Sequence, residues 1–200
     1  MVAEVAVGGD LGSPQERLIL ASTSPQRRAI LEQLRISFEV VTPTYVEDDP
    51  PGVAAEELVR IHADGKARSV HREGRLTLGV DTTVLLDGRI YGKAADEVEA
   101  RHMLNELSGR THAVVSGVCL LGGDEDVVAH EVTEVTFRLL SQVAMTAYLA
   151  SEEWKSRAGA YAIQGLGGRL VERIDGDYLN VVGLPAACLL RVLTERGLTF

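Results

Sequence analysis

The sequence predicts an α/β protein in which helices cover a mixed β-sheet. Strand-like apolar runs and capped helical segments alternate along the chain, without the regular rhythm of repeated strand–helix–strand units. Two long β-rich runs flank Gly122-Gly123, a pattern typical of an antiparallel hairpin. Apolar residues make up 46% and charged residues 24% of the 200 residues, a balance typical of one globular domain with a substantial core.

The predicted strands are apolar runs bounded by turn residues. Asp87-Gly88 and Gly122-Gly123 indicate two hairpin turns, and Asp175-Gly176 separates the last two expected strands. The expected strands cover residues 17–22, 38–41, 76–86, 90–91, 113–121, 127–139, 169–174 and 178–182.

The predicted helices begin at residues that cap helix N-termini. Ser24, Asp96 and Ser141 are the expected N-caps, and Pro25 occupies the first position of its helix. The expected helices cover residues 25–34, 54–71, 97–107, 142–150 and 184–196. Residues 42–52 hold three prolines and an acidic run, so we expect a loop there.

Charge and composition exclude several classes of protein. A net charge of −9 argues against binding a nucleic acid polymer, and no apolar run approaches the ~18 residues of a membrane span. Residues 1–16 are rich in glycine, carry no basic region and predict a flexible tail rather than a secretory signal. We expect one domain over residues 17–200, with Cys119 and Cys188 as buried free thiols of a cytoplasmic protein.

The first chemical signal lies where the first strand meets the first helix. Ser22 ends the strand, and Arg27 and Arg28 fall in the first helical turn, where cations are locally unfavourable. They are favourable if this turn binds an anion, because free N–H groups, hydroxyls and guanidinium groups then meet phosphate oxygens. The alternative is that both arginines extend into solvent or pair with Glu32.

The second signal is Asp81, which interrupts an otherwise apolar strand. A buried carboxylate is costly unless cations or hydrogen bonds compensate it, so Asp81 is a candidate general base or metal ligand. The alternative is a turn cap at a strand end, but the apolar Val84 and Leu85 that follow favour the functional role.

Weaker signals come from two lysines and a glycine-rich segment. Lys66 lies on the apolar face of a helix, and Lys93 follows the short strand, although either could reach the surface harmlessly. Gln164 begins a glycine-rich stretch that a strand follows, which excludes a dinucleotide-binding turn. The sequence also lacks the zinc-protease, nucleophile-elbow and P-loop motifs.

Together these segments resemble the Maf family of nucleotide pyrophosphatases. The resemblance covers nearly everything from residue 17 onward, and its blocks occur in the family's order. The blocks are LILASTSPQRR at 18–28, GVDT at 79–82, LDGRIYGK at 86–93, MLNELSGRTH at 103–112, AIQGLGG at 162–168 and GDYLNVVGLP at 176–185.

The resemblance implies an elongated mixed α/β fold with two lobes and a cleft between them, related to inosine triphosphatases, in a homodimer. It implies hydrolysis of a nucleoside triphosphate to the monophosphate and pyrophosphate with Mg²⁺ or Mn²⁺. Asp81 matches the proton acceptor and a metal ligand, and Glu39 matches an acidic position that helps hold the metal. The phosphate-facing positions are Ser22, Arg27, Arg28, Lys66 and Lys93.

Three further positions are associated with substrate choice: Gln26, Thr82 and Gln164. Thr82 and Gln164 agree with the branch that acts on dTTP and UTP, whereas Gln26 departs from it, because that branch usually has arginine there. Modified pyrimidine nucleotides and 7-methyl-GTP therefore stay open as alternative substrates. Another alternative is a non-catalytic nucleotide-binding regulator of septum formation, against which the buried Asp81 argues.

Overall fold

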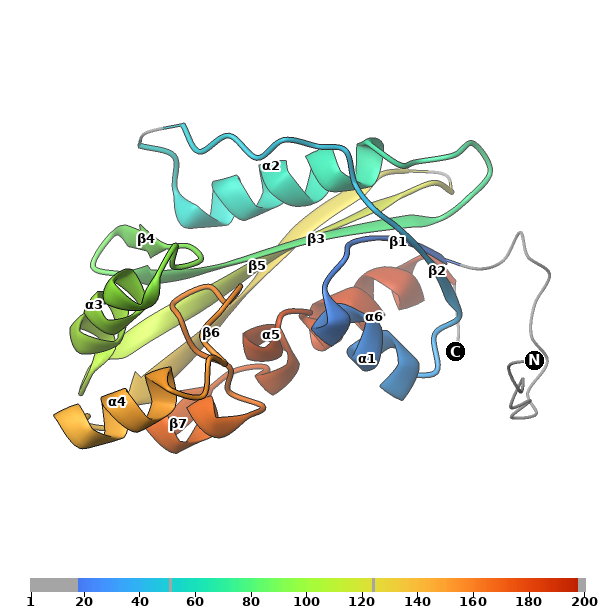
Figure 1. Cartoon of the computed structure of the whole chain (residues 1–200). Coiled ribbons are helices and arrows are strands. Elements are labelled where there is room, and N and C mark those ends of the chain that lie inside the picture. The colour runs from blue at the N-terminus through green and yellow to red at the C-terminus, as the bar shows by residue number, and fades with distance from the viewer. Residues whose placement is uncertain (1–17, 51, 124, 198–200) are drawn as a thin grey trace, which may run out of the picture.

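The computed structural model describes residues 18–50, 52–123 and 125–197. The expected tail at residues 1–16 lies outside these ranges. Seven strands form one sheet in the order β2-β1-β3-β5-β6-β7, and β4 pairs with β3 (Figure 1). The strands are β1 (Leu18–Ala21), β2 (Phe38–Val41), β3 (Thr77–Leu86), β4 (Arg89–Tyr91), β5 (Thr111–Leu121), β6 (Val127–Phe137) and β7 (Val171–Asp175).

The sheet is mixed, as predicted. β1 pairs in parallel with both β2 and β3, whereas the pairs β3–β4, β3–β5, β5–β6 and β6–β7 are antiparallel. Both predicted hairpins, β3–β4 and β5–β6, are therefore confirmed. The helices are α1 (Pro25–Gln33), α2 (Ala55–Arg68), α3 (Glu97–Leu107), α4 (Gln142–Leu149), α5 (Tyr178–Val182) and α6 (Ala186–Glu195), with a short 3₁₀ helix η1 (Leu166–Leu170).

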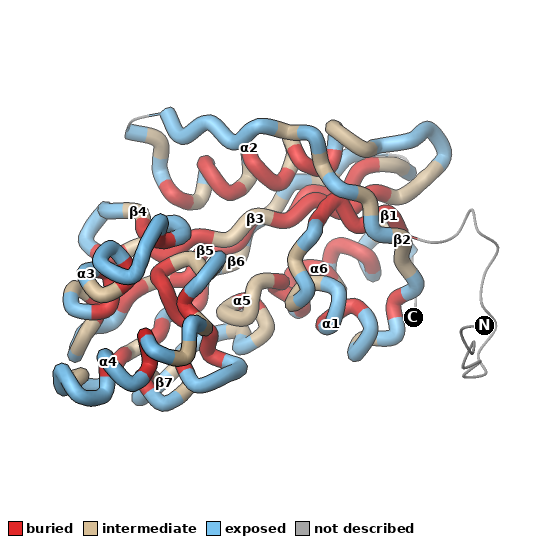
Figure 2. The backbone as a smooth tube through the Cα atoms, viewed as in Figure 1, coloured by how far each residue is buried: buried red, intermediate tan, exposed pale blue. Residues whose placement is uncertain are grey.

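The elongated molecule has two main apolar clusters, one toward each end of the sheet (Figures 1 and 2). At one end, α1 and α6 pack on β1, β3 and β5 through residues such as Leu31, Leu78 and Leu189. At the other end, α3 and α4 pack on the far halves of β3, β5 and β6 through Leu104, Phe137 and Leu149. The long central strands run through both clusters. Among the described residues, no helix is long and apolar enough to cross a membrane.

Helix α2 lies unusually close to the opposite face of the sheet because two strand glycines face it. A Cβ added to Gly79 would lie 2.0 Å from the Ala63 carbonyl oxygen, and one added to Gly117 would lie 2.2 Å from the Val59 carbonyl oxygen. Gly117 pairs with Asp81 across β3 and β5. The glycines therefore permit a close approach that brings polar groups of α2 down to Asp81.

One predicted strand is wrong: residues 178–182 form helix α5. Asp177 caps this helix by accepting a hydrogen bond from the Leu179 N–H, and Gly183 ends it at a φ of 128°. The buried Asn180 amide donates to the Val114 carbonyl oxygen at 3.1 Å. Caps at both ends and this tertiary contact outweigh the strand preference of Tyr178 and the two valines.

Strand ends also differ from the prediction. The last strand begins at Val171 rather than 169, because η1 includes Arg169 and Leu170. Strand β6 ends at Phe137 rather than 139, since the Arg138 N–H bonds to the Leu170 carbonyl oxygen outside the ladder.

Candidate active site

A cleft of about 440 Å³ opens where β3 has an unpaired edge. Strand β1 pairs with β3 only as far as Gly79, and β4 pairs with it only from Val84. Residues 80–83 therefore pair with β5 on one edge but have no strand partner on the other, where the turn after β1 lines the same cleft. Ligands of open α/β sheets commonly bind in such crevices, beyond the carboxyl ends of parallel strands.

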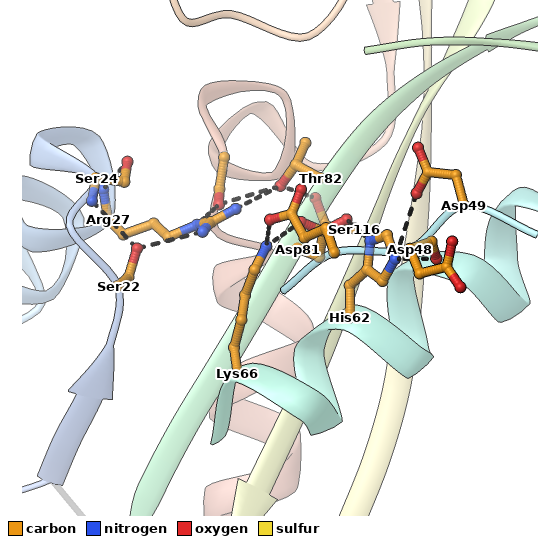
Figure 3. A network of polar contacts seen from close by, with 12 residues as sticks. Ser22, Ser24, Arg27, Asp48, Asp49, His62, Lys66, Asp81, Thr82 and Ser116 are labelled. Carbon is orange, nitrogen blue, oxygen red and sulfur yellow. Dashed lines mark hydrogen bonds and ion pairs between the residues drawn. The ribbon is translucent and has the colours of Figure 1, made fainter. Parts of the chain in front are cut away.

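One wall of the cleft is the turn that leads into α1. The Ser24 hydroxyl oxygen caps the helix by accepting from the Arg27 N–H. The Arg27 side chain donates from Nε to the Gly183 carbonyl oxygen at 2.9 Å, and from Nη1 and Nη2 to the hydroxyls of Ser22 and Thr82, both at 3.3 Å (Figure 3). Neutral acceptors thus hold this cation in the cleft without a hydrogen-bonded carboxylate. Desolvation lowers the pKa of Arg27, and the charge of Asp81 acts in the opposite direction.

The opposite wall is a charged network around Asp81. The Asp81 side chain is 14% exposed, and its Oδ1 accepts a hydrogen bond from Lys66 Nζ at 2.5 Å. Lys66 Nζ also lies 2.6 Å from Glu47 Oε1. His62, one helical turn before Lys66, places Nδ1 3.5 Å from Asp81 Oδ2 and Nε2 3.1 Å from the Asp48 carbonyl oxygen. Figure 3 shows both α2 side chains directed at Asp81.

This network favours the charged forms of Asp81 and His62. Burial by itself raises the pKa of Asp81, but the hydrogen bond from His62 and the charges of Lys66 and Arg27 outweigh burial and hold that pKa well below its usual range. The hydrogen bond to Asp81 raises the pKa of His62 against the effect of its own burial. Both ring nitrogens of His62 face oxygens that only accept, which is the environment of an imidazolium.

The same residues fit a divalent cation. The candidate donor atoms of Glu47, His62 and Asp81 lie within 4.8 Å of one another, but a protonated His62 cannot bind a metal, so the two carboxylates are the candidate ligands. Carboxylate oxygens are the ligands that Mg²⁺ and Mn²⁺ prefer. The Lys66 ammonium group already bridges the two carboxylates, so the site accommodates positive charge.

The structure brings most of the predicted site residues to one place. The cleft is lined by Ser22, Gln26, Arg27, Lys66, Asp81, Thr82, Lys93 and Gln164.

Two predicted site residues do not line the cleft. Arg28 is exposed on α1, outside the cleft lining. Glu39 pairs with Arg72 and Arg75, and it aligns through Ile19 with Thr77, two strands across and four residues before Asp81. Ordinary strand spacings put Glu39 roughly 16 Å from Asp81. Glu47 occupies the place beside Asp81 that we expected for Glu39.

Sequence reasoning missed three residues of the site. His62 precedes Lys66 by four positions, so helical spacing could have placed both on one face. Glu47 begins the acidic run that we interpreted only as a loop. Arg157 lines the cleft from the loop after α4, and no local pattern indicates this.

Fold and site together define an α/β protein with a cation-rich cleft beside a buried carboxylate. The fold is similar to that of the HAM1 protein from Coxiella burnetii, with a TM-score of 0.52 and 18% identity over 90% of this chain and 99% of that one. The chain itself belongs to the family of Maf-like proteins, whose model matches residues 17–196.

Curated relatives are similar over almost their whole length. A dTTP/UTP pyrophosphatase of Symbiobacterium thermophilum is 46% identical over 184 residues, which cover 91% of this chain and 95% of the relative. The dTTP/UTP pyrophosphatase of Nitratidesulfovibrio vulgaris is 46% identical and covers 90% of this chain and 88% of its own. The dTTP/UTP pyrophosphatase of Pyrococcus furiosus is 40% identical, and the match covers 89% of this chain and 94% of that relative.

Proposed function

We propose that this chain is a nucleoside triphosphate pyrophosphatase that hydrolyses dTTP and UTP to the monophosphate and pyrophosphate. The names of its relatives support this proposal. The observation that carries it is the convergence of Arg27, Lys66 and Lys93 on one cleft beside the partly buried Asp81, in a chain whose net charge is −9. Such a local concentration of cations is the environment that a triphosphate requires.

The triphosphate would lie between the α1 turn and the Asp81 network. Ser22, the positive N-terminal end of α1 and the Arg27 guanidinium bind phosphate oxygens on one side. Lys66 and Lys93 bind them on the other side. Cations on both sides neutralise charge on the phosphoryl group and on the departing pyrophosphate.

We propose Asp81 and Glu47, rather than Glu39, as carboxylate ligands of Mg²⁺ or Mn²⁺. When bound, such a cation supplies Lewis-acid chemistry, lowering the pKa of water and screening phosphate charge. Lys66 then exchanges its two carboxylate partners for phosphate oxygens. This exchange needs only a small movement, because Lys66 Nζ already lies at the cleft wall.

Asp81 orients the water that attacks the α-phosphorus and takes its proton. In the free protein its pKa is low, which makes it a weak base. Phosphate oxygens compete with Asp81 for Lys66 and screen the charge of Arg27, so binding of the substrate raises the basicity of Asp81. In-line attack then breaks the bond to the bridging oxygen, and pyrophosphate leaves.

The base would lie against the apolar part of the cleft lining, which includes Tyr161, Val182 and Val114. Thr82 and Gln164 of the same lining supply hydrogen-bonding groups. This combination suits an aromatic ring with polar edges.

The test is pyrophosphate release from a panel of nucleoside triphosphates with Mg²⁺ or Mn²⁺. We expect turnover of dTTP and UTP above that of purine nucleotides and 7-methyl-GTP. Faster turnover of a purine or modified nucleotide would contradict the proposed substrates but still support the proposed reaction. Absence of release from every nucleotide would favour a binding protein.

We also propose a homodimer, which the family resemblance implies. Light scattering during size-exclusion chromatography should then give twice the chain mass of 21.5 kDa. A mass of one chain across the micromolar range would contradict the dimer.

A further inference from the structure

The cleft contains one contact that the proposed reaction does not use. Arg157 Nη1 donates a hydrogen bond of 2.6 Å to Gln26 Oε1. Gln26 belongs to the first turn of α1, and Arg157 belongs to the loop after α4, 131 positions later. Both residues line the cleft, so their contact joins two of its walls.

This contact determines which way the Gln26 amide faces. Arginine nitrogens donate and never accept, so the amide atom beside Arg157 must be the oxygen. The Ser24 hydroxyl is a second donor to the same oxygen, at 3.2 Å. Within the described part of the chain, the Gln26 amide nitrogen makes no hydrogen bond. Gln26 therefore offers the cleft a donor, the NH₂ group, while its acceptor is occupied.

The loop that carries Arg157 is held in place. The Gly159 N–H donates to the carbonyl oxygens of Tyr91 and Gly92, and Ala158 forms a β-bridge with Lys93. Across the described ranges, no carboxylate pairs with Arg157, and its buried Nε has no hydrogen-bond partner. The one side-chain acceptor that positions this guanidinium is therefore Gln26.

We infer that Arg157 is a positioning residue that makes Gln26 a hydrogen-bond donor to the nucleobase. This inference rests on the proposed function. The loop of Arg157 continues directly into Tyr161 and Gln164, which line the same cleft as Gln26 and which we propose to contact the base. A fixed NH₂ group accepts no proton, so it favours bases that present a carbonyl oxygen, such as uracil and thymine. It disfavours cytosine, which presents an amino group in place of one carbonyl.

UTP and CTP provide the matched substrates for a test, because their bases differ in this carbonyl and amino group. We expect Arg157→Met, which removes the donor but keeps a long side chain, to lower the preference for UTP over CTP about tenfold, because the amide can then rotate. Arg157→Lys keeps a donor and should retain most of the preference. Lys155→Met is the control, since Lys155 is exposed and pairs with Glu152.

The preference is measured as the ratio of affinities for UTP and CTP analogues with a non-hydrolysable α,β-imido bridge, beside the ratio of kcat/KM. The affinity ratio tests the inference even if the protein proves not to hydrolyse nucleotides. If Arg157 acts through Gln26, adding Arg157→Met to Gln26→Ala should change neither ratio further. The melting temperature of each variant should stay near that of the wild type.

Two results would overturn the inference. In the first, Arg157→Met weakens binding of UTP and CTP equally and leaves the ratio unchanged, so that Arg157 serves the phosphates. In the second, the wild-type protein binds both analogues equally well.

Discussion

Two buried histidines of this protein have opposite electrostatic environments. His62 on α2 is 3% exposed, and His112 on β5 is 2% exposed. Hydrogen bonding to Asp81 raises the pKa of His62, whereas desolvation lowers the pKa of His112 to about 4. The exposed fractions are nearly equal, so exposure alone does not explain why the two pKa values move in opposite directions.

The difference lies in the partners. His112 Nε2 contacts the Tyr161 hydroxyl at 2.9 Å, and its Nδ1 has no hydrogen-bond partner. The rings of Phe137 and Tyr161 lie edge-on to it, at centroid distances of 4.9 and 5.5 Å. Among the described residues no carboxylate contacts this ring, and burial favours its neutral form. The central cleft thus places its histidine in a charged network, whereas the end of the sheet with α3 and α4 uses its histidine as a polar part of an aromatic cluster.

Removing the Asp81 carboxylate should have the largest effect on the difference between His62 and His112. Asp81→Asn should lower turnover on the order of a hundredfold or more, because the variant can neither take a proton nor bind the metal as a carboxylate. Nucleotide binding without metal should survive, since Arg27 and Lys66 remain. NMR titration should show a lower pKa for His62 and an unchanged pKa for His112. Near-normal turnover would contradict the role of Asp81.

Lowering the pH should reveal the contribution of His112 to the free energy of unfolding. The native pKa of His112 is about 4, below its ordinary value of 6.5, so only the unfolded chain takes up the proton between these values. The stability that neutral His112 contributes is complete above pH 6.5 and is lost as the pH falls toward 4, by about 3 kcal/mol in total. His112→Gln should remove this part of the acid sensitivity. Urea unfolding of both proteins at pH 7 and pH 4.5 measures it, and parallel losses would contradict the assignment.

A shift of α2 should change the environment of His62 but not that of His112. Gly117→Ala places a methyl group against the Val59 carbonyl, so the helix must shift, at a cost of about 1–3 kcal/mol in the free energy of unfolding. Gly92→Ala is the control, because nothing lies within 4 Å of its added Cβ. Chemical denaturation measures the stabilities, and NMR should show a shifted His62 and an unchanged His112. Equal stability of both variants would contradict the close approach of α2.

The smallest expected effect is the pH dependence that His62 itself contributes. Its native pKa is raised, so its contribution to stability is complete below its ordinary pKa of 6.5 and is lost as the pH rises through the native value. His62→Gln should therefore flatten the alkaline part of the stability profile, opposite in direction to His112→Gln. Unfolding in EDTA at pH 6 and pH 9 measures this, and an unchanged profile would contradict a charged His62.

The site was predictable wherever a residue contradicts its local pattern. Asp81 stands out because carboxylates rarely interrupt apolar strands, and Arg27 stands out because arginine is unfavourable at a helix N-terminus. Glu47 and Glu39 carry no such contrast, since acidic residues are ordinary in loops and on exposed strand positions. Only the contacts of Glu47 and Asp48 with α2 place Glu47 rather than Glu39 beside Asp81.

The sequence by itself determined the helix starts at Ser24, Asp96 and Ser141, the antiparallel hairpins and the mixed α/β class. These depend on capping and periodicity, which act between residues a few positions apart. Only the tertiary structure decided that residues 178–182 are helical, that the two buried histidines have opposite surroundings, and that Arg157 contacts Gln26. Each of these depends on contacts between residues far apart in the chain, whose energies leave no pattern in any short stretch of sequence.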